Sequence, residues 1–331
     1  MTKGTRQLNN FFLACLAIAG MLLLLSAGLS GQETVPAMAG GFSALMNRPP
    51  NVPEEYVTTP FGYFHPSCVL LLEEGNTLRA DGRVQHADGT IEAAHVCGYP
   101  HYTPGGVLVS ADGSKPNPLV INGWLESVSA TTSTAYGKIA AIWIVPPSPT
   151  SDDGQILYFF PGFEDSNDVI SIVQPVLQWG NNGSFGGNYW LVASWNCCIS
   201  GTTWYSSPLD VNVGDTILGT ITPTCKPGGN CPTWNVVSAD KTTGTKTTLA
   251  KTAADGQVWN WAFGAVSEDY NLVQCSDFPN DSKLTFTVRL YDQNFRVITN
   301  PNWQGTQWIP NPNPKCSYGT IETKTQETVE Y

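Results

Sequence analysis

The sequence predicts an all-β protein built as a two-sheet antiparallel β-sandwich of the jelly-roll or concanavalin-like kind, preceded by a small disulfide-tied segment. Three observations lead to this prediction. The chain of 331 residues contains 32 Gly and 24 Pro, which favours many turns. Between residues 118 and 296, short runs of β-branched and aromatic residues are separated by Gly, Pro, Asn and Asp. No segment of that region keeps a helical period of apolar residues, so two packed antiparallel sheets follow.

Residues 1–30 are predicted to be a signal peptide. Lys3 and Arg6 form a basic start, residues 11–25 are apolar, and small residues follow at positions 26–30. The apolar run is shorter than a membrane span, and no basic stop follows it. We therefore expect cleavage and a secreted, extracellular product that is not held in the membrane.

Residues 31–117 are predicted to form an N-terminal accessory module or pro-segment. Glu-Gly and Asp-Gly pairs at 74–75, 81–82 and 88–89 lie between β-type runs and are typical of hairpins. All four histidines of the chain, His65, His86, His95 and His101, lie in this segment. Their spacing matches no familiar metal motif, so we expect surface or packing histidines and no metal site.

Eight cysteines follow the leader, and an even number in an exported chain favours disulfides. Cys68 and Cys97 are expected to pair, as are Cys225 and Cys231. The remaining four are Cys197, Cys198, Cys275 and Cys316, and the sequence leaves their partners open.

The sandwich domain is predicted to span 118–296, followed by an irregular tail at 297–331. Within it, residues 154–195 are expected to form three strands joined by polar turns. The second of these strands carries Gln174 and Gln178, four residues apart and so on one face unless a bulge intervenes. Pro175 cannot donate a ladder hydrogen bond, which predicts an edge strand or a bulge there.

Composition excludes several functional classes. The formal net charge is −11, so a basic nucleic-acid-binding surface is not expected. No P-loop, Rossmann, GxSxG or HExxH motif occurs. Because the sandwich region contains no histidine, a Ser-His-Asp or Cys-His mechanism inside it would need a histidine from the N-terminal segment. Carboxylate and amide chemistry remains, with these candidates besides the two glutamines: Glu126, Glu164, Asp165, Asp168, Glu268 and Asp269.

Glu268 lies in a strand that is otherwise apolar and aromatic. Strict alternation would place Trp261, Phe263, Ala265 and Ser267 on one face and Glu268 on the other. A carboxyl among apolar residues has a raised pKa and can act as general acid or base at low pH. The alternative is that Glu268 belongs to the solvated end of the strand.

Four short motifs, in order, resemble the eqolisin family of glutamic peptidases. They are the Asn-Gly-Trp start at 122–124 with Trp-Ile-Val-Pro at 143–146, the stretch YFFPGFED followed by SIVQPVLQWG, the Gly-Asp strand SSPLDVNVGDTILGTIT, and GAVSEDYNL. The strand before the glutamate departs from the family pattern by one residue. The resemblance implies a Gln/Glu dyad of Gln174 and Glu268, with Gln178 as the alternative glutamine.

The resemblance further implies a secreted, acid-acting endopeptidase. Glu268 would activate a water, and Gln174 would position it and stabilise the oxyanion. Such a mechanism needs no cofactor and no metal. The expected partner is a polypeptide substrate, and we expect a monomer. Beyond the dyad, four side chains are candidates for substrate binding, although core packing is the alternative for each tryptophan: Trp143, Gln178, Trp179 and Trp190.

Two other functions remain open at this point. The 11 Trp and 12 Tyr residues, with loops rich in Asn and Gly, also suit a secreted carbohydrate-binding, lectin-like sandwich. A structural extracellular protein without catalysis is the third possibility. The geometry of Gln174 and Glu268 discriminates among them, because a dyad requires both side chains on one face within about one water's reach.

Overall fold

The computed structural model describes residues 47–110, 124–167, 171–228 and 230–331, all of which belong to one compact unit, Phe42–Tyr331. The predicted signal peptide and Asp168 lie outside the described residues. The described residues form strands, turns and two short 3₁₀ segments, η1 (Pro66–Cys68) and η2 (Cys275–Asp277). Within these ranges, no helix is long and apolar enough to cross a membrane.

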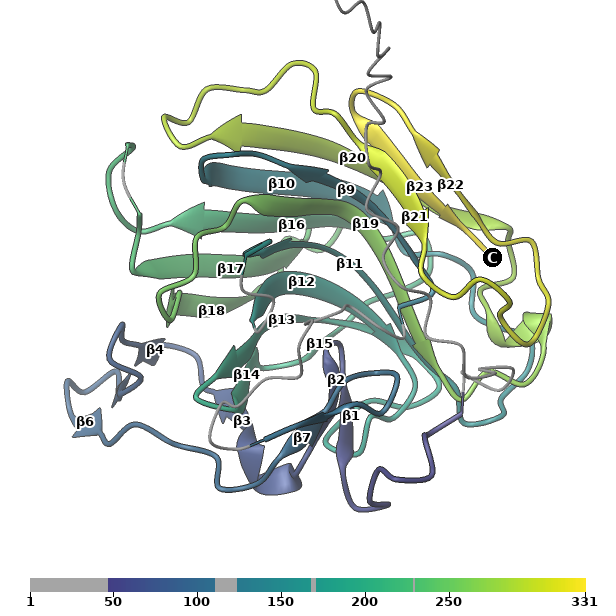
Figure 1. The fold of residues 1–331 in the computed structure, drawn as a ribbon, viewed down its shortest axis with the longest axis horizontal. Coiled ribbons are helices and arrows are strands. Elements are labelled where there is room, and N and C mark those ends of the chain that lie inside the picture. Colours follow the sequence, from purple (N-terminus) through teal and green to yellow (C-terminus); the bar gives the residue numbers. More distant parts are fainter. Residues whose placement is uncertain (1–46, 111–123, 168–170, 229) are drawn as a thin grey trace, which may run out of the picture. The chain divides into compact units, whose positions relative to one another are not determined.

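Two large sheets pack face to face, as the sequence predicted (Figure 1). The larger sheet has nine strands, eight in its main path and one further strand, β15 (Leu209–Asp210), paired to β13. Its path runs through β21 (Gln304–Gln307), β9 (Glu126–Thr131), β19 (Trp261–Tyr270), β11 (Ile156–Glu164), β12 (Ile172–Trp179), β13 (Trp190–Ile199), β14 (Thr202–Ser206) and β3 (Val69–Leu72). The smaller, seven-stranded sheet runs through β18 (Lys246–Ala253), β17 (Thr233–Asp240), β16 (Thr216–Pro223), β10 (Tyr136–Ile144), β20 (Lys283–Asp292), β23 (Gln326–Glu330) and β22 (Gly319–Glu322).

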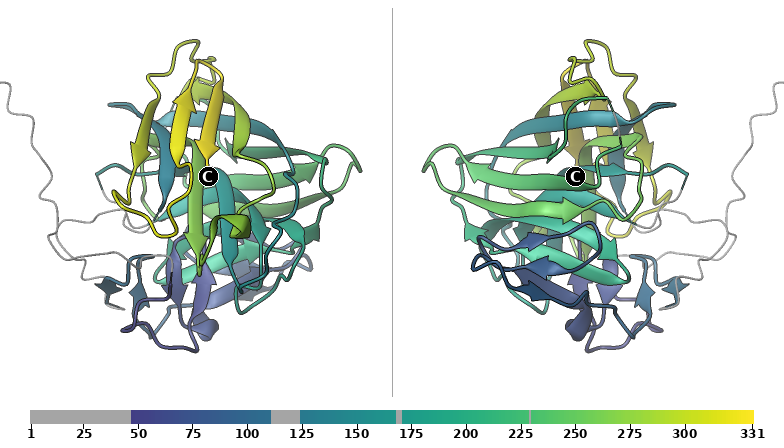
Figure 2. Two further views of the ribbon diagram at one scale, coloured as in Figure 1. Left: turned by 90° about the vertical axis from the view of Figure 1, so that its right-hand side faces the viewer. Right: turned by 90° about the vertical axis from the view of Figure 1, so that its left-hand side faces the viewer.

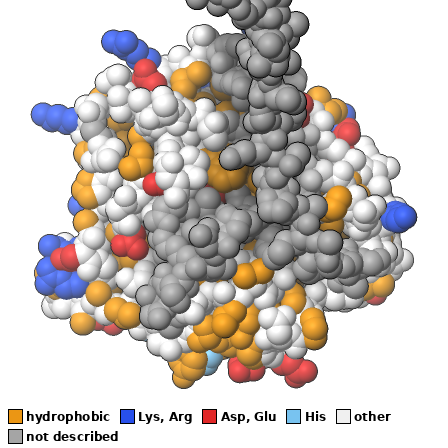
Figure 3. All heavy atoms as spheres, viewed as in Figure 1, with side chains coloured by type: hydrophobic (Ala, Val, Ile, Leu, Met, Phe, Trp, Pro, Cys, Tyr) orange, Lys and Arg blue, Asp and Glu red, His pale blue; other side chains and the backbone are white. Residues whose placement is uncertain are grey.

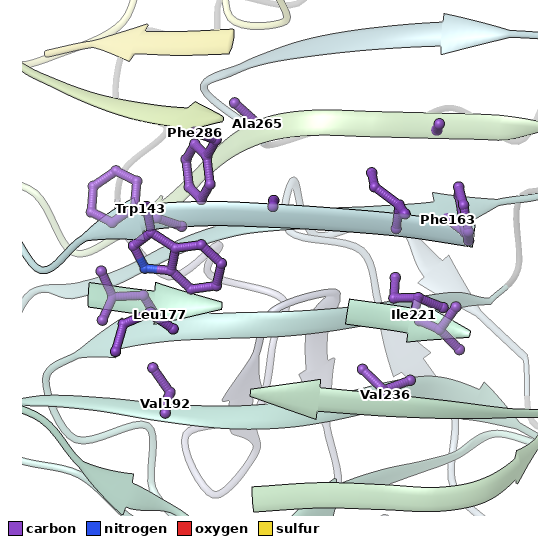
Figure 4. Packing of buried hydrophobic residues seen from close by; sticks show 14 of the residues in the cluster. Trp143, Phe163, Leu177, Val192, Ile221, Val236, Ala265 and Phe286 are labelled. Atoms are coloured by element: carbon purple, nitrogen blue, oxygen red, sulfur yellow. The ribbon is translucent and has the colours of Figure 1, made fainter. Parts of the chain in front are cut away.

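Between the two sheets lies a continuous apolar core, here called the inter-sheet core. Trp143 and Phe286 come from the smaller sheet, and Leu177, Val192 and Ala265 come from the larger one (Figure 4). Strands β16 and β17 alternate between buried and half-buried residues, as expected when one face meets a core and the other meets solvent. Strands β11, β12 and β13 are buried at every position, which means that a second layer covers their other face.

That second layer is the N-terminal module. It comprises a four-stranded sheet, β1 (Val57–Thr59), β2 (Gly62–Phe64), β7 (His101–Tyr102) and β8 (Leu108–Val109), and a three-stranded one, β4 (Thr77–Leu78), β5 (Val84–Gln85) and β6 (Ile91–Glu92). Figure 2 shows these strands at the opposite end of the molecule from β22 and β23. Strand β3 pairs in parallel with β14, so the module also extends the large sheet. The Asp-Gly turns predicted at 81–82 and 88–89 are present, with Gly82 and Gly89 at positive φ.

The C-terminal tail differs from the prediction of an irregular segment. It supplies β21 to the large sheet and β22 and β23 to the small one. Val329 of β23 is fully buried in the inter-sheet core. The short alternating run 326–330 therefore forms a strand because β20 offers it a partner, which local sequence did not indicate.

Disulfides form between Cys68 and Cys97, between Cys225 and Cys231, and between Cys275 and Cys316. The first two pairs were predicted, and the third resolves two of the four cysteines left open. Cys197 and Cys198 are both buried in β13. On the face of Figure 3, the visible Lys and Arg side chains are scattered at the margins, as the net charge of −11 suggests.

Candidate functional site

The ladder between β11 and β12 is interrupted where two prolines face each other. Leu157–Phe159 pair with Leu177–Trp179, and Phe163–Glu164 pair with Ile172–Val173, in a constant register that sets Pro161 opposite Pro175. Neither proline has an N–H to donate, so the backbone hydrogen bonds between β11 and β12 are interrupted there. The interruption that Pro175 predicts is therefore found, but in a central strand of the sheet and without a bulge on the side of β13. Gln174 lies at this opening.

Gln174 is fully buried, yet its amide has a partner outside its own sheet. Its Nε2 donates a hydrogen bond of 2.6 Å to the backbone carbonyl of Pro60. Pro60 lies in the turn that joins β1 to β2, where Thr59 pairs with Gly62. The glutamine side chain thus points away from the inter-sheet core and toward the N-terminal module. The Pro60 carbonyl thus provides a partner for the buried Nε2, whereas the Oε1 of Gln174 is buried without a hydrogen-bond partner.

Glu268 is also fully buried and lies against the same turn. The Tyr270 hydroxyl, the Trp124 side chain and the Gly62 N–H lie near the carboxyl and would lower its pKa. Burial outweighs them and, together with the nearby Asp269, raises the pKa of Glu268 well above its ordinary value. The predicted desolvation of this carboxyl is present in the structure, and Glu268 is not at a solvated strand end.

The Tyr270 hydroxyl lies between two oxygens that could each accept its proton. It lies within hydrogen-bond distance of the Glu268 carboxyl and 3.1 Å from the Thr59 carbonyl oxygen. A hydroxyl has one proton and can donate to only one of them. All three groups are satisfied when Tyr270 donates to Thr59 and a protonated Glu268 donates to Tyr270. Geometry and the raised pKa therefore agree that Glu268 is protonated while the turn covers it.

A bulge corrects the predicted faces of β19. Its register with β9 and with β11 shifts between Phe263 and Ala265, because Gly264 is an extra residue there. As a result, Trp261 and Phe263 lie on the face of Glu268, and Ala265 and Ser267 lie on the opposite one. A Cβ at Gly264 would lie 2.6 Å from Glu327 Cγ, so glycine is also needed for the sheets to approach.

Gln178 shares the face of Gln174, as predicted, but its side chain is used differently. It is in register with Glu268 across β11, since both pair with Tyr158. Its Nε2 donates to the backbone carbonyls of Gly180, at 3.0 Å, and Phe185, at 3.4 Å. These bonds hold the loop that leads into β13. Gln178 therefore anchors its own loop, whereas Gln174 reaches a different segment of the chain.

The three tryptophans expected in a substrate groove lie elsewhere, which corrects that prediction. Trp143, Trp179 and Trp190 are all buried in the inter-sheet core, on the opposite side of the large sheet from Gln174. Strand alternation explains the difference for β12, because Trp179 follows Gln178 and so points the other way. The alternative of core packing is the one that the structure supports for these three residues.

The remaining candidate carboxyls lie in different places relative to the two faces of the large sheet. Glu126 and Asp269 lie on the side of the inter-sheet core, where burial raises their pKa values to about 9 and about 8. Glu164 is fully buried, and burial and the proximity of Glu268 raise its pKa. Asp165 accepts hydrogen bonds from the backbone N–H groups of Asn167 and Val258 and so shapes a loop.

Among the described residues, no group of three or more His, Cys, Asp or Glu is placed to hold a metal ion.

Sequence reasoning missed Tyr158 and Tyr270. Both hydroxyls are buried on the face of Gln174 and Glu268 and donate to the module's backbone, Tyr158 to Thr58 O at 2.8 Å. Tyr270 follows Glu268 by two residues, so alternation alone places it on the same face. No local signal indicates that a segment some 200 residues earlier in the chain supplies its acceptor.

Comparisons with known proteins give a distant likeness. No protein-family model matches the chain, and no curated protein matches its sequence. Scytalido-glutamic peptidase with a transition-state analogue inhibitor aligns with 64% of this chain and 100% of its own, at 15% identity and a TM-score of 0.46. SCP-B, a member of the eqolisin family of peptidases, in complex with the tripeptide Ala-Ile-His, aligns over the same shares at 15% identity and a TM-score of 0.42. A tailspike protein from Escherichia coli O157:H7 bacteriophage CAB120 aligns with 56% of this chain and 29% of its own, at 10% identity and a TM-score of 0.25. Because these TM-scores are below 0.5, the function is inferred from the site itself.

Proposed function

We propose that this chain is a peptidase of glutamic type that hydrolyses peptide bonds with Gln174 and Glu268. One observation carries the proposal. Two buried polar side chains on one face of the large sheet lie against the same turn of backbone: Gln174 donates to the Pro60 carbonyl, and the Glu268 carboxyl lies near the Gly62 N–H, which lowers its pKa. Those two groups are only two residues apart along the chain. The pair thus already holds a stretch of polypeptide between an amide donor and a carboxyl.

The chemistry follows from what each group can do once water and substrate replace the turn. Solvent entry removes much of the desolvation that keeps Glu268 protonated, so its pKa falls toward the ordinary range. The carboxylate then takes a proton from a water that attacks the scissile carbonyl, and returns a proton to the leaving nitrogen. Tyr270 and Trp124 hold the carboxyl in place.

Gln174 is assigned the oxyanion role over Gln178. In the structure its Nε2 already donates to a peptide carbonyl of another segment, which is the contact that oxyanion stabilisation requires. The amide of Gln178 is engaged by the carbonyls of its own loop, Gly180 and Phe185. The register of Gln178 with Glu268 favours it as the alternative, and substitution of each glutamine separates the two.

Three disulfides support the proposal that the enzyme works outside the cell. We further propose that it acts as a secreted monomer on polypeptides.

Hydrolysis of casein between pH 2 and 5, with product peptides identified by mass spectrometry, tests the proposed activity. The wild-type chain should release peptides, and Glu268→Ala should not. Activity that survives in Glu268→Ala would refute the assigned mechanism. Absence of hydrolysis at every pH, even after the site has been opened as described below, would favour a binding module such as the lectin-like alternative.

A further inference from the structure

Three consecutive backbone carbonyls of the N-terminal module are held by three side chains of the large sheet. Tyr158 donates to Thr58 O at 2.8 Å, Tyr270 to Thr59 O at 3.1 Å, and Gln174 to Pro60 O at 2.6 Å. The donors come from three neighbouring strands, β11, β19 and β12. The acceptors belong to one continuous segment, residues 58–60, all of it buried.

This contact differs from ordinary packing between layers. Core layers meet through apolar side chains, whereas here polar side chains reach past them to backbone oxygens. Every polypeptide carries such oxygens, whatever its sequence, so this set of donors suits a backbone that bends as residues 58–60 do at the start of their turn. The arrangement is that of a peptide-binding site filled by a segment of its own chain.

The segment is fastened on both sides of the turn. Arg48 donates to the carbonyls of Pro53 and Tyr56, at 2.8 Å each, and its guanidinium lies over the Tyr63 ring. The Thr58 N–H donates to Asn182 O at 3.0 Å, which joins the hairpin to the loop after β12. The segment is thus held both by its own module and by the sheet that it covers.

With the hairpin in place, Gln174 and Glu268 are covered and have no contact with solvent water. In this conformation the turn also uses the groups that a substrate would need. A site that activates water must admit it, so the conformation described here is a closed one. Opening requires the β1–β2 hairpin, residues 57–64, to leave the face of the large sheet. Strand β3 and the Cys68–Cys97 disulfide hold the rest of the module to the large sheet and so do not have to move.

We propose that the β1–β2 hairpin is an internal inhibitor that occupies the substrate site, and that Tyr158 and Tyr270 hold backbone carbonyls of a peptide substrate as they hold those of Thr58 and Thr59. The inference rests on the proposed function for the identity of the substrate. Its test, however, uses binding and not hydrolysis, so the two can fail separately.

Gly62→Val is the variant that opens the site. Gly62 has φ +110°, and a Cβ there would lie 2.1 Å from the Tyr102 carbonyl oxygen, so a side chain dislodges the hairpin from β7. Gly89→Val is the matched control, because Gly89 also has positive φ, at +88°, but no atom within 4 Å of its added Cβ. Both substitutions are made in the full chain carrying Glu268→Gln, so that a bound peptide is not cleaved.

The probe is the octapeptide of residues 57–64, VTTPFGYF, acetylated and amidated, with binding measured by calorimetry. We expect Gly62→Val to bind it at least tenfold more tightly than Gly89→Val does, since the internal competitor is gone. Equal affinities in the two variants, or no binding by either, would overturn the proposal. If Gly62→Val fails to fold, Phe61→Asp serves instead, because half-buried Phe61 packs against the cluster under the hairpin.

Hydrogen exchange provides an independent measurement on the unsubstituted hairpin. Saturating octapeptide should speed exchange of the Thr58 amide, which is bonded to Asn182 O in the closed form. Unchanged exchange with bound peptide would mean that the peptide binds elsewhere and would contradict the inference. Tighter peptide binding by Gly62→Val, together with no casein hydrolysis by Gly62→Val in the chain that retains Glu268, would keep the occluded site and reject the peptidase.

Discussion

The two faces of the large sheet bury polar groups in different ways. On the face toward the N-terminal module, Gln174, Tyr158 and Tyr270 each donate to a backbone carbonyl of another segment. On the face toward the inter-sheet core, Glu126 and Asp269 are buried among apolar side chains, and their raised pKa values keep them protonated near neutral pH. Carboxyls with raised pKa values lie on both faces, since Glu164 and Glu268 are buried on the module side. The difference is that three donors on the module face converge on one continuous stretch of backbone.

Replacing the amide at Gln174 should produce the largest change in function. Gln174→Leu removes the donor to the scissile carbonyl, so kcat should fall by about 10²–10³-fold, the loss typical of one oxyanion-hole donor. The measurement is steady-state hydrolysis of a fluorogenic peptide by the hairpin-opened chain. Comparable loss in Gln178→Leu, with Gln174→Leu near wild type, would transfer the role to Gln178.

The carboxyls of the inter-sheet core should make the fold most stable in acid. Burial raises the pKa values of Glu126 to about 9, and of Asp269 and Glu327 to about 8. Because these values exceed those of the unfolded chain, near 4, the folded state binds more protons. The associated stability is complete below about pH 4 and is lost as pH rises toward 8–9.

Thermal unfolding between pH 4 and pH 9 measures this effect. Each pKa unit corresponds to about 1.4 kcal/mol, so the melting temperature should fall by roughly 5 °C or more over this range. Glu126→Gln should flatten the dependence, since a neutral amide has no proton to lose. A melting temperature that rises with pH in the wild-type chain would contradict the protonation assigned to this core.

Substitution of Gln178 should have the smallest effect on activity, and it serves as the matched comparison for substitution of Gln174. Gln178→Leu removes the bonds to Gly180 O and Phe185 O. The buried Gly180 carbonyl loses its side-chain donor, whereas Phe185 O keeps the Asn182 N–H. Stability should fall by about 1–3 kcal/mol while kcat stays within a few-fold of wild type. Denaturant unfolding measures the first quantity, and a loss of activity without a loss of stability would show that Gln178 touches substrate.

Local sequence was sufficient for the parts of the fold that depend on neighbours along the chain. The strands within 154–195 and the Asp-Gly turns follow from alternation and turn chemistry, whereas the burial of Glu268 was one of two alternatives that local sequence left open. Two disulfides, Cys68–Cys97 and Cys225–Cys231, also follow from local sequence.

The remaining features depend on contacts between distant segments. The bulge at Gly264 reverses the face of Phe263, and no pattern in the strand marks its position. The tail forms strands because β9 and β20 offer edges to pair with. The hairpin over Gln174 is a contact across 114 residues, beyond the reach of any periodicity.

One matched pair of carboxyl variants tests the central claim, that the hairpin face of the large sheet is a site of peptide hydrolysis. Glu268→Gln and Glu126→Gln each replace a buried glutamate with an amide of the same size, which cannot act as an acid or base, on opposite faces of the same sheet. We predict that kcat/KM for peptide hydrolysis by the hairpin-opened chain falls by about 10²–10⁴-fold in Glu268→Gln and stays within a few-fold in Glu126→Gln. Equal activity in the two variants would contradict the account.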